Sequence, residues 1–395
     1  MTRSTRVRAG ITGALILVAA TTALSARRQS PAPSGGYAAI VASPRPLTVS
    51  TLTTDGGRLD WSPDGQRLAF DRLGEDGYFD VYTMATNGTD VRCLTCNKDG
   101  LPAKSMGNPA WHPSGNYLAF QAQNAYQGLG SITDYFANPG IGVNNDLWIG
   151  DKEGVRFWRM TTVPTQQGAV LHPQFSPQGN RLLWSERLST DGGKWGTWAL
   201  KLADFRIDGS GVPHVDNVRT LQPGAQRQMY ESHGFSPDGR LILFSGNLEA
   251  GQAETGADIY LLDPASGQLT NLTQSMDEWD EHAHFSPDGS TIVWMTNRSQ
   301  SWSMLFGVLH TDFWTMNADG SNKRRLTWFN DHSSPQFLSG GVIAADSSWS
   351  PDGTRLATYL ITDVRRGGHS TILGMPRRAP APTSPGGLRV QRDSR

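Results

Sequence analysis

The sequence predicts an all-β protein folded as a six-bladed β-propeller with four-stranded blades. An aromatic residue followed by Ser-Pro-Asp-Gly, or a close variant, occurs six times: at Trp61–Gly65, Trp111–Gly115, Phe175–Gly179, Phe235–Gly239, Phe285–Gly289 and Trp349–Gly353. A short apolar stretch follows every copy: RLAF, YLAF, RLLW, LILF, TIVW and RLAT. A second pattern, of two strands around a polar turn, follows several copies. A unit repeated at this scale is typical of solenoids, propellers and arrays.

Each copy is expected to form a β-hairpin. In the first copy the Ser62 hydroxyl can bond the backbone, Pro63 fixes φ, and Gly65 takes the fourth position of a type I turn. The aromatic residue before the turn and the alternating residues after it favour strands. Each copy therefore supplies the first two strands of a blade.

The second pattern supplies the other two strands. It begins with Asp and an apolar, partly aromatic strand, continues through a turn rich in Gly, Asn and Asp, and ends in Leu-Thr or Met-Thr. It occurs at Asp80–Thr95, Asp146–Thr161, Asp258–Thr273 and Asp312–Thr327. Four strands per repeat make one propeller blade. The copies lie 50 to 64 residues apart, so the surplus residues are expected in loops.

The sixth copy lacks the last strand of this pattern. The chain continues through Leu356–Asp363 and Ser370–Met375 and then becomes rich in Pro and Arg. Pro46–Thr53, ahead of the first copy, resembles the missing strand. We expect this N-terminal strand to complete the last blade and close the ring, which removes exposed sheet edges.

The domain organisation is expected to be a leader, a linker, one propeller and a tail. Residues 1–26 combine a basic head, an uncharged apolar run and a small-residue end, which is typical of a signal peptide, or of a short anchor if uncleaved. Residues 27–45 are rich in Pro, Gly and Ser and predict a linker. Residues 46–376 form the propeller, and 377–395, with five Arg and one Asp, predict a disordered basic tail.

Charge and motifs favour an exported protein that does not bind nucleic acid. Cleavage after residue 26 removes three arginines and takes the formal charge from −1 to −4, the wrong sign for a general nucleic-acid binder. We expect a periplasmic or secreted location, with no stable membrane span unless the leader is uncleaved. The expected partner is an envelope or extracellular protein, or a glycan. The sequence contains no P-loop, HExxH, dinucleotide or G-x-S-x-G motif.

Cys93 and Cys96 are the two cysteines of the chain. In an extended strand their Cα atoms would lie roughly 10 Å apart, too far for a disulfide. They can bridge only if the chain turns after Leu94-Thr95, and a zinc site would need two further ligands. We favour two ordinary thiols at a strand end, with a local disulfide as the alternative because export favours oxidation.

The repeated aromatic-Ser-Pro-Asp-Gly units, with their Asp-led strands and Leu-Thr endings, resemble the WD40-like repeats of the TolB-type propeller. The resemblance runs from Pro46 to Met375, nearly the whole chain. It implies a six-bladed propeller that acts by binding a partner. The same kind of propeller precedes the hydrolase domain of prolyl-oligopeptidase-like peptidases.

Histidines precede the aromatic residue in three consecutive copies. Because the innermost strands of a propeller enter its channel from one rim, these side chains are expected to converge. Imidazoles and carboxylates suit a divalent transition metal. The His-x-His before the fifth copy, with a His one blade earlier, is similar to the oligogalacturonate lyases, whose propellers hold a manganese ion. This resemblance implies His233, His282 and His284 as ligands of manganese, zinc or iron.

Five further residues are expected to bind a ligand at the channel rim: His172, Glu231, Trp279, Glu281 and Trp302. Trp279 stands where the lyases have Gln, and we assign no catalytic residue. The alternative is that the histidines are structural and bond backbone carbonyls. Our leading hypothesis is an exported, non-enzymatic propeller that binds a protein or glycan through its rim loops. The alternatives are a metal-dependent polysaccharide lyase or hydrolase, and a scaffold of an envelope complex.

Overall fold

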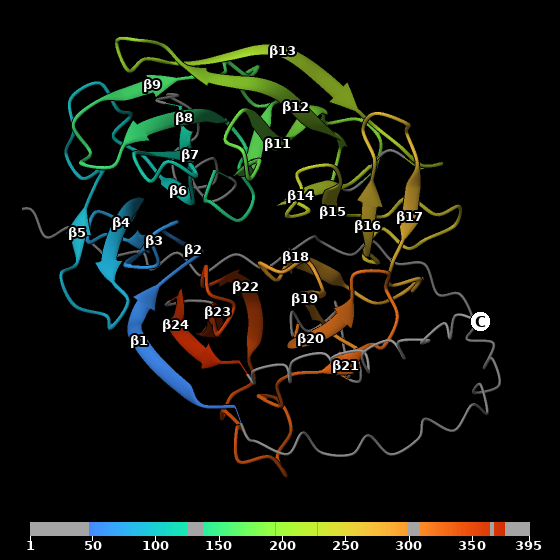
Figure 1. The fold of residues 1–395 in the computed structure, drawn as a ribbon. Helices are drawn as coiled ribbons and strands as arrows, with labels where there is room; N and C mark the ends of the chain where they lie inside the picture. Colours follow the sequence, from blue (N-terminus) through green and yellow to red (C-terminus); the bar gives the residue numbers. More distant parts are fainter. Residues whose placement is uncertain are drawn as a thin grey trace, which may run out of the picture.

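Six four-stranded antiparallel sheets form a closed ring (Figure 1). The computed structural model describes residues 47–124, 137–193, 195–226, 228–298, 300, 309–363 and 367–375, and these contain strands and no helix. The sequence-based prediction of an all-β, six-bladed propeller is therefore confirmed. Strand order within each sheet runs outward from the channel.

The innermost strands are β2 (Leu59–Trp61), β6 (Met106–Trp111), β10 (Ala169–Phe175), β14 (Tyr230–Phe235), β18 (Asp280–Phe285) and β22 (Ile343–Trp349). The second strands are β3 (Arg67–Leu73), β7 (Tyr117–Gln123), β11 (Arg181–Ser189), β15 (Ile242–Gly246), β19 (Thr291–Thr296) and β23 (Arg355–Asp363). The third strands are β4 (Phe79–Ala85), β8 (Asn145–Asp151), β12 (Thr197–Ile207), β16 (Asp258–Leu262), β20 (Asp312–Asn317) and β24 (Gly367–Gly374). The outermost strands are β5 (Arg92–Cys93), β9 (Phe157–Arg159), β13 (Pro213–Leu221), β17 (Leu269–Asn271), β21 (Arg324–Arg325) and β1 (Val49–Gly56).

The Ser-Pro-Asp-Gly turn joins the first two strands of every blade. In the first copy the Gly65 amide donates to the Ser62 carbonyl at 2.8 Å, and Gly65 has φ of +71°, a conformation that glycine adopts readily. The Ser62 hydroxyl donates to Asp64 at 2.6 Å and accepts the Arg67 amide at 2.9 Å. These side chains thus supply hydrogen-bond partners within the turn, which explains why Ser and Asp recur.

The Asp and Thr of the second pattern bond one another. The Thr95 hydroxyl donates to the Asp80 carboxylate at 2.7 Å and accepts the Val81 amide at 2.9 Å. The same two bonds occur in three other blades, at the pairs Asp146 and Thr161, Asp258 and Thr273, and Asp312 and Thr327. The motif therefore ties the start of the third strand to the end of the fourth.

The N-terminal strand closes the ring. β1 pairs antiparallel with β24, and the two lie side by side although they come from opposite ends of the sequence (Figure 1). The prediction of closure is confirmed, with the strand running to Gly56 rather than Thr53. Pro46 lies outside the described residues.

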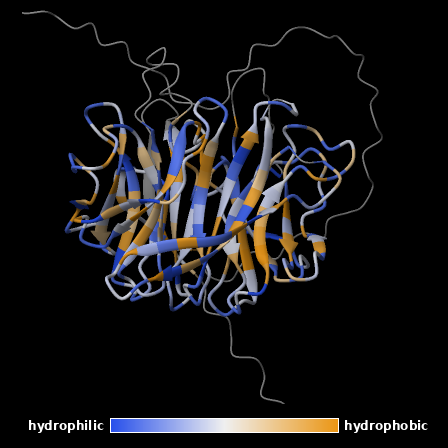
Figure 2. Ribbon diagram, turned by 90° about the horizontal axis from the view of Figure 1, so that it is seen from above, coloured by the Kyte–Doolittle hydropathy of each residue, from blue (hydrophilic) through white to orange (hydrophobic). Residues whose placement is uncertain are grey.

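Large apolar side chains fill the spaces between neighbouring blades. Trp294 of β19 is fully buried with Ile259 of the preceding blade, and Trp184 of β11 is buried with Ile149 of its own preceding blade. Figure 2, turned by 90°, shows the hydrophobic segments in the strands and mostly hydrophilic loops at both ends. Burial of such side chains is the main force that holds a propeller together.

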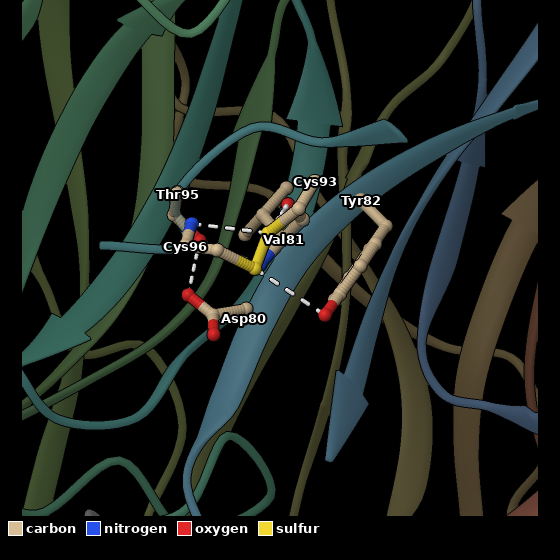
Figure 3. The surroundings of a disulfide bond; sticks show 6 residues. All are labelled: Asp80, Val81, Tyr82, Cys93, Thr95 and Cys96. Atoms are coloured by element: carbon tan, nitrogen blue, oxygen red, sulfur yellow. Dashed lines mark hydrogen bonds between the residues drawn. A yellow bond between two sulfur atoms is a disulfide. The ribbon is translucent and has the colours of Figure 1, made fainter. Parts of the chain in front are cut away.

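Cys93 and Cys96 form a disulfide (Figure 3). The expectation of two ordinary thiols is wrong, because the chain turns after β5 and brings the Cα atoms to 5.7 Å. The Cys96 amide donates to Cys93 Sγ at 3.0 Å across this turn. Both sulfurs are bonded to each other, so neither serves as a thiolate ligand for zinc.

The predicted leader, linker and tail lie outside the described residues, which begin at Leu47 and end at Met375. Within the described ranges, no helix has the length and apolar character needed to cross a membrane.

Candidate functional site in the central channel

A β-bulge in the innermost strand places one side chain at the channel in successive blades. The pairing register skips the residues two and three places before the aromatic residue of the repeat in β6, β10 and β18, and three and four places before it in β22. In β14 it skips His233, two places before the aromatic residue, and β2 has no such shift. Asn108, His172 and His282 occupy this position with φ of 52°, 51° and 49°. Bulges are common beside functional sites because they redirect a side chain.

The equivalent position, three residues before each aromatic, is occupied in blade order by Arg58, Asn108, His172, Ser232, His282 and Asp346. In the fourth blade the bulged residue is His233, one place further along, and Gly234 follows with φ of 122°. A residue with a Cβ adopts this conformation rarely. Gly234 therefore allows a histidine, rather than Ser232, to occupy the bulge.

Four histidines from three adjacent blades lie together in the channel. The ring centroid of His282 is 5.1 Å from that of His172 and 5.6 Å from that of His233, and His284 lies 6.2 Å from His233. His172, His233 and His282 are buried. Residues more than one hundred positions apart in the sequence thus meet.

Glu231 stands between two of these imidazoles. Its Oε1 atom is 3.1 Å from His172 Nε2 and 3.7 Å from His282 Nε2. His172, Glu231, His233 and His282 each present one ligand atom, and the four atoms lie within 4.8 Å of one another. This spacing is suitable for one metal ion with nitrogen and oxygen ligands.

His284 belongs to a neighbouring group centred on Asp346. Its Nε2 atom is 3.2 Å from Asp346 Oδ1, and His282 Nδ1 is 3.6 Å from the same oxygen. Of the three histidines implied as metal ligands by the sequence resemblance, the structure places His233 and His282 in the four-residue set. His172 and Glu231, rather than His284, complete it.

The environment assigns different protonation states to the three buried histidines. Burial lowers the pKa of His172 to about 4 and, with the neighbouring imidazoles, holds the pKa of His233 well below its usual value. Burial also acts to lower the pKa of His282, but the carboxylates of Asp346 and Glu231 outweigh it and raise the pKa. His172 and His233 are therefore neutral, the form of imidazole that binds metals.

Glu231 and Glu281 form an unequal carboxyl pair. Burial and the adjacent charge of Glu231 raise the pKa of Glu281 well above its usual value. Burial also acts to raise the pKa of Glu231, but His172 and His282 outweigh it and lower that pKa. Glu281 thus holds its proton to a higher pH than Glu231 does, as expected when two buried carboxyls share a site. The Trp279 indole donates to Glu281 Oε2 at 2.5 Å.

The predicted rim residues fall into three groups. His172, Glu231 and Glu281 lie in the histidine cluster. Trp279 is 8% exposed and acts as a hydrogen-bond donor to Glu281 rather than as a rim surface. Trp302 lies outside the described residues.

The channel also contains polar residues that sequence reasoning missed. A pocket beside the histidine cluster is lined by Arg58, Asp60, Asn108, His172, His284 and Asp346, among others. Burial raises the pKa of Asp60 to about 6. Alignment of the six copies three residues before their aromatic residue would have identified Arg58, Asn108 and Asp346.

The comparison of solved structures agrees with this architecture. A TolB protein described as putative from Agrobacterium tumefaciens matches with a TM-score of 0.51 and 18% identity, over 84% of this chain and 98% of that chain. The chain has the fold of a TolB-like propeller. An oligogalacturonate lyase from Vibrio parahaemolyticus matches with a TM-score of 0.45 and 13% identity, over 83% of this chain and 93% of that one. The first likeness, at 18% identity, concerns the fold alone.

Curated relatives of this TolB-like propeller carry an enzyme name. Dipeptidyl-peptidase 5 of Porphyromonas endodontalis is 39% identical over 63% of this chain and 30% of its own length. The protein of the same name from Porphyromonas gingivalis is 22% identical over 57% of this chain and 36% of its own length. The chain thus spans about a third of the length of these relatives. No protein-family model matches it.

Proposed function

We propose that this chain is an exported ligand-binding propeller that holds a divalent transition metal in its central channel. The observation that carries the proposal is the set of four buried ligand atoms, from His172, Glu231, His233 and His282, within 4.8 Å of one another. Three imidazole nitrogens and one carboxylate oxygen suit manganese, iron or zinc.

The residues fit such an ion in two further respects. Burial holds two of the imidazoles neutral and the neighbouring histidines lower the pKa of Glu231, so three of the four groups are already in the form that binds a metal. His233 Nδ1 is buried without a hydrogen-bond partner, while its Nε2 contacts the Ser245 hydroxyl. A buried nitrogen without a partner is costly, and coordination would satisfy it.

Metal analysis of the purified chain tests this proposal. We expect one equivalent of manganese, iron or zinc per chain after reconstitution and desalting. The double variant His233→Ala, His282→Ala should lose it, and His214→Ala should retain it because His214 pairs with Asp208 at 2.8 Å, away from the cluster. Less than a tenth of an equivalent in the reconstituted wild type would contradict the proposal.

The partner is expected to be a protein or a glycan that reaches the channel through the rim loops. The peptidase name of the curated relatives favours a peptide segment, although the chain spans only about a third of those proteins. Measuring the binding of peptide and oligosaccharide libraries to the metal-loaded chain distinguishes a protein partner from a glycan partner. Binding that persists unchanged in the His233→Ala, His282→Ala variant would place the partner site on the loops instead.

A second candidate is a metal-dependent polysaccharide lyase or hydrolase. The observation that favours it is the unequal carboxyl pair, because one protonated and one ionised group can act as acid and base. Release of unsaturated or reducing ends from polygalacturonate by the metal-loaded chain tests this function. We expect Glu281→Gln to abolish any such activity while leaving the metal content intact; an unchanged rate in that variant would exclude the pair from catalysis.

A further inference from the structure

The disulfide between Cys93 and Cys96 is expected to stabilise the fold less than a bridge across a long loop would. It spans only two intervening residues at the end of β5, and a bridge across so short a loop restricts the unfolded chain least. Both cysteines are partly exposed, unlike the buried Leu94 and Thr95 between them. A C-x-x-C pair in this setting is accessible to an external thiol.

Each sulfur has a hydrogen-bond donor of its own (Figure 3). The Cys96 amide donates to Cys93 Sγ at 3.0 Å, and the Tyr82 hydroxyl donates to Cys96 Sγ at 3.3 Å. Donors of this kind stabilise the thiolate that forms when a disulfide opens. Thiol–disulfide exchange requires each sulfur in turn to leave as a thiolate. Because each sulfur has its own donor, both cysteines can do so.

A carboxyl group stands beside the pair. A ligand atom of Asp80 and both sulfurs lie within 4.8 Å of one another, and the Thr95 hydroxyl holds the carboxylate at 2.7 Å. Burial raises the pKa of Asp80. This group can take up and return the thiol proton as the pair opens and closes.

We propose that Cys93 and Cys96 form a redox-active pair that oxidises two thiols of another protein. A partner thiolate attacks Cys93 Sγ, the bond between the sulfurs breaks, and Cys96 leaves as a thiolate beside the Tyr82 hydroxyl. A second partner thiolate attacks the partner sulfur of this mixed disulfide, and Cys93 leaves as a thiolate beside the Cys96 amide.

The electrons and protons of this exchange balance. The partner loses two electrons and two thiol protons and gains a disulfide. Cys93 and Cys96 take up both electrons and, on protonation, become thiols. Glutathione disulfide re-forms the bond by the reverse exchange and becomes two molecules of glutathione.

Exchange of the intact, folded chain with glutathione is the first test. We expect millimolar reduced glutathione to open the disulfide without denaturant, with alkylation adding two labels per chain and the thermal midpoint falling by no more than a few degrees. A disulfide that resists glutathione until the chain unfolds would overturn the proposal.

A peptide that contains two cysteines, used as its disulfide for trapping and in its reduced form for the oxidation assay, provides the second test. The Cys96→Ser variant should accumulate a mixed disulfide at Cys93 after addition of the peptide disulfide, at least ten times more than Cys93→Ser does. Tyr82→Phe should slow peptide oxidation by the wild-type pair about three- to tenfold and shift the pH profile upward. Tyr117→Phe, which loses a hydroxyl bond to Gly211 in another blade, is the matched control. Equal trapping by both serine variants, or no trapping, would contradict the assigned order of attack.

Discussion

The Ser348 hydroxyl donates to Asp60 Oδ1 at 2.8 Å across the junction between the last blade and the first. The same hydroxyl accepts the Trp61 amide at 3.1 Å, and Asp60 Oδ2 accepts the Trp111 amide of the second blade at 2.7 Å. Asp60 therefore connects three blades at the channel end of the ring closure. The pairing of β1 with β24 closes the same junction at its outer edge.

Replacing Ser348 with Ala should destabilise this junction. The change removes the donor to Asp60 and leaves the buried Trp61 amide without its partner, which costs about 1–3 kcal/mol. Urea unfolding measures the loss. Ser266→Ala, in an exposed turn, should change the free energy of unfolding by no more than about 0.5 kcal/mol. Equal stabilities for the two variants would show that the junction does not depend on this bond.

Stability should fall as the pH rises through about 6, in part because of Asp280. Burial raises its pKa from 3.8 to about 6, so the folded state holds a proton that the unfolded state has already released. Its contribution is fully present below about pH 4 and is lost as the pH rises past 6. Asp280→Asn should remove on the order of 2 kcal/mol of this change.

Urea unfolding between pH 4 and 7.5 checks the sign of this effect. Asp263→Asn is the control, because Asp263 is held below its usual pKa by turn amides and titrates outside this window. A wild-type slope identical to that of Asp280→Asn would show that Asp280 has an ordinary pKa.

Thr273→Val should test the Asp–Thr tie between the third and fourth strands. The Thr273 hydroxyl donates to Asp258 at 2.7 Å and accepts the Ile259 amide at 2.9 Å, and both side chains are buried. Loss of both bonds should cost about 2–3 kcal/mol. Thr270→Val, at the exposed position of β17, should have little effect on the melting temperature.

Metal should stabilise the folded chain through the channel cluster. An ion that binds only the folded state adds about 2.7 kcal/mol at one hundred times its dissociation constant, which raises the melting temperature by a few degrees. The shift should disappear in His172→Ala and in the presence of a chelator. Thermal denaturation with manganese, zinc and iron(II) measures it, and a similar shift in His172→Ala would assign the ion to another site.

The fold could be predicted because its signals are local. Each Ser-Pro-Asp-Gly copy specifies one pair of strands through its turn chemistry, and each Asp-to-Thr pattern specifies another pair. The number of repeats gives the number of blades. The disulfide could not be derived with the same certainty, because the turn after Leu94 depends on how β5 ends. Cysteine spacing alone does not reveal that turn.

The site could be predicted only in part. The histidines of three repeats were expected to converge because equivalent positions of a propeller face the same channel. The bulges break the alternation of the innermost strands that contain them, so a strand pattern does not show which side chain enters the channel. Asp346 was missed for this reason. Trp279, expected to bind at the channel rim, is buried and donates a hydrogen bond to Glu281.

The repeated bulge gives the channel five positions that can vary separately, at Asn108, His172, His233, His282 and Asp346. Each is set by the backbone of its own blade, and its side chain lies outside the paired residues of the sheet. Substitution at one position therefore alters the chemistry of the channel while the hairpins around it stay the same. A propeller built in this way can acquire or lose a metal, an acid or a cation through single changes, which gives protein engineers a defined set of places at which to install new binding properties.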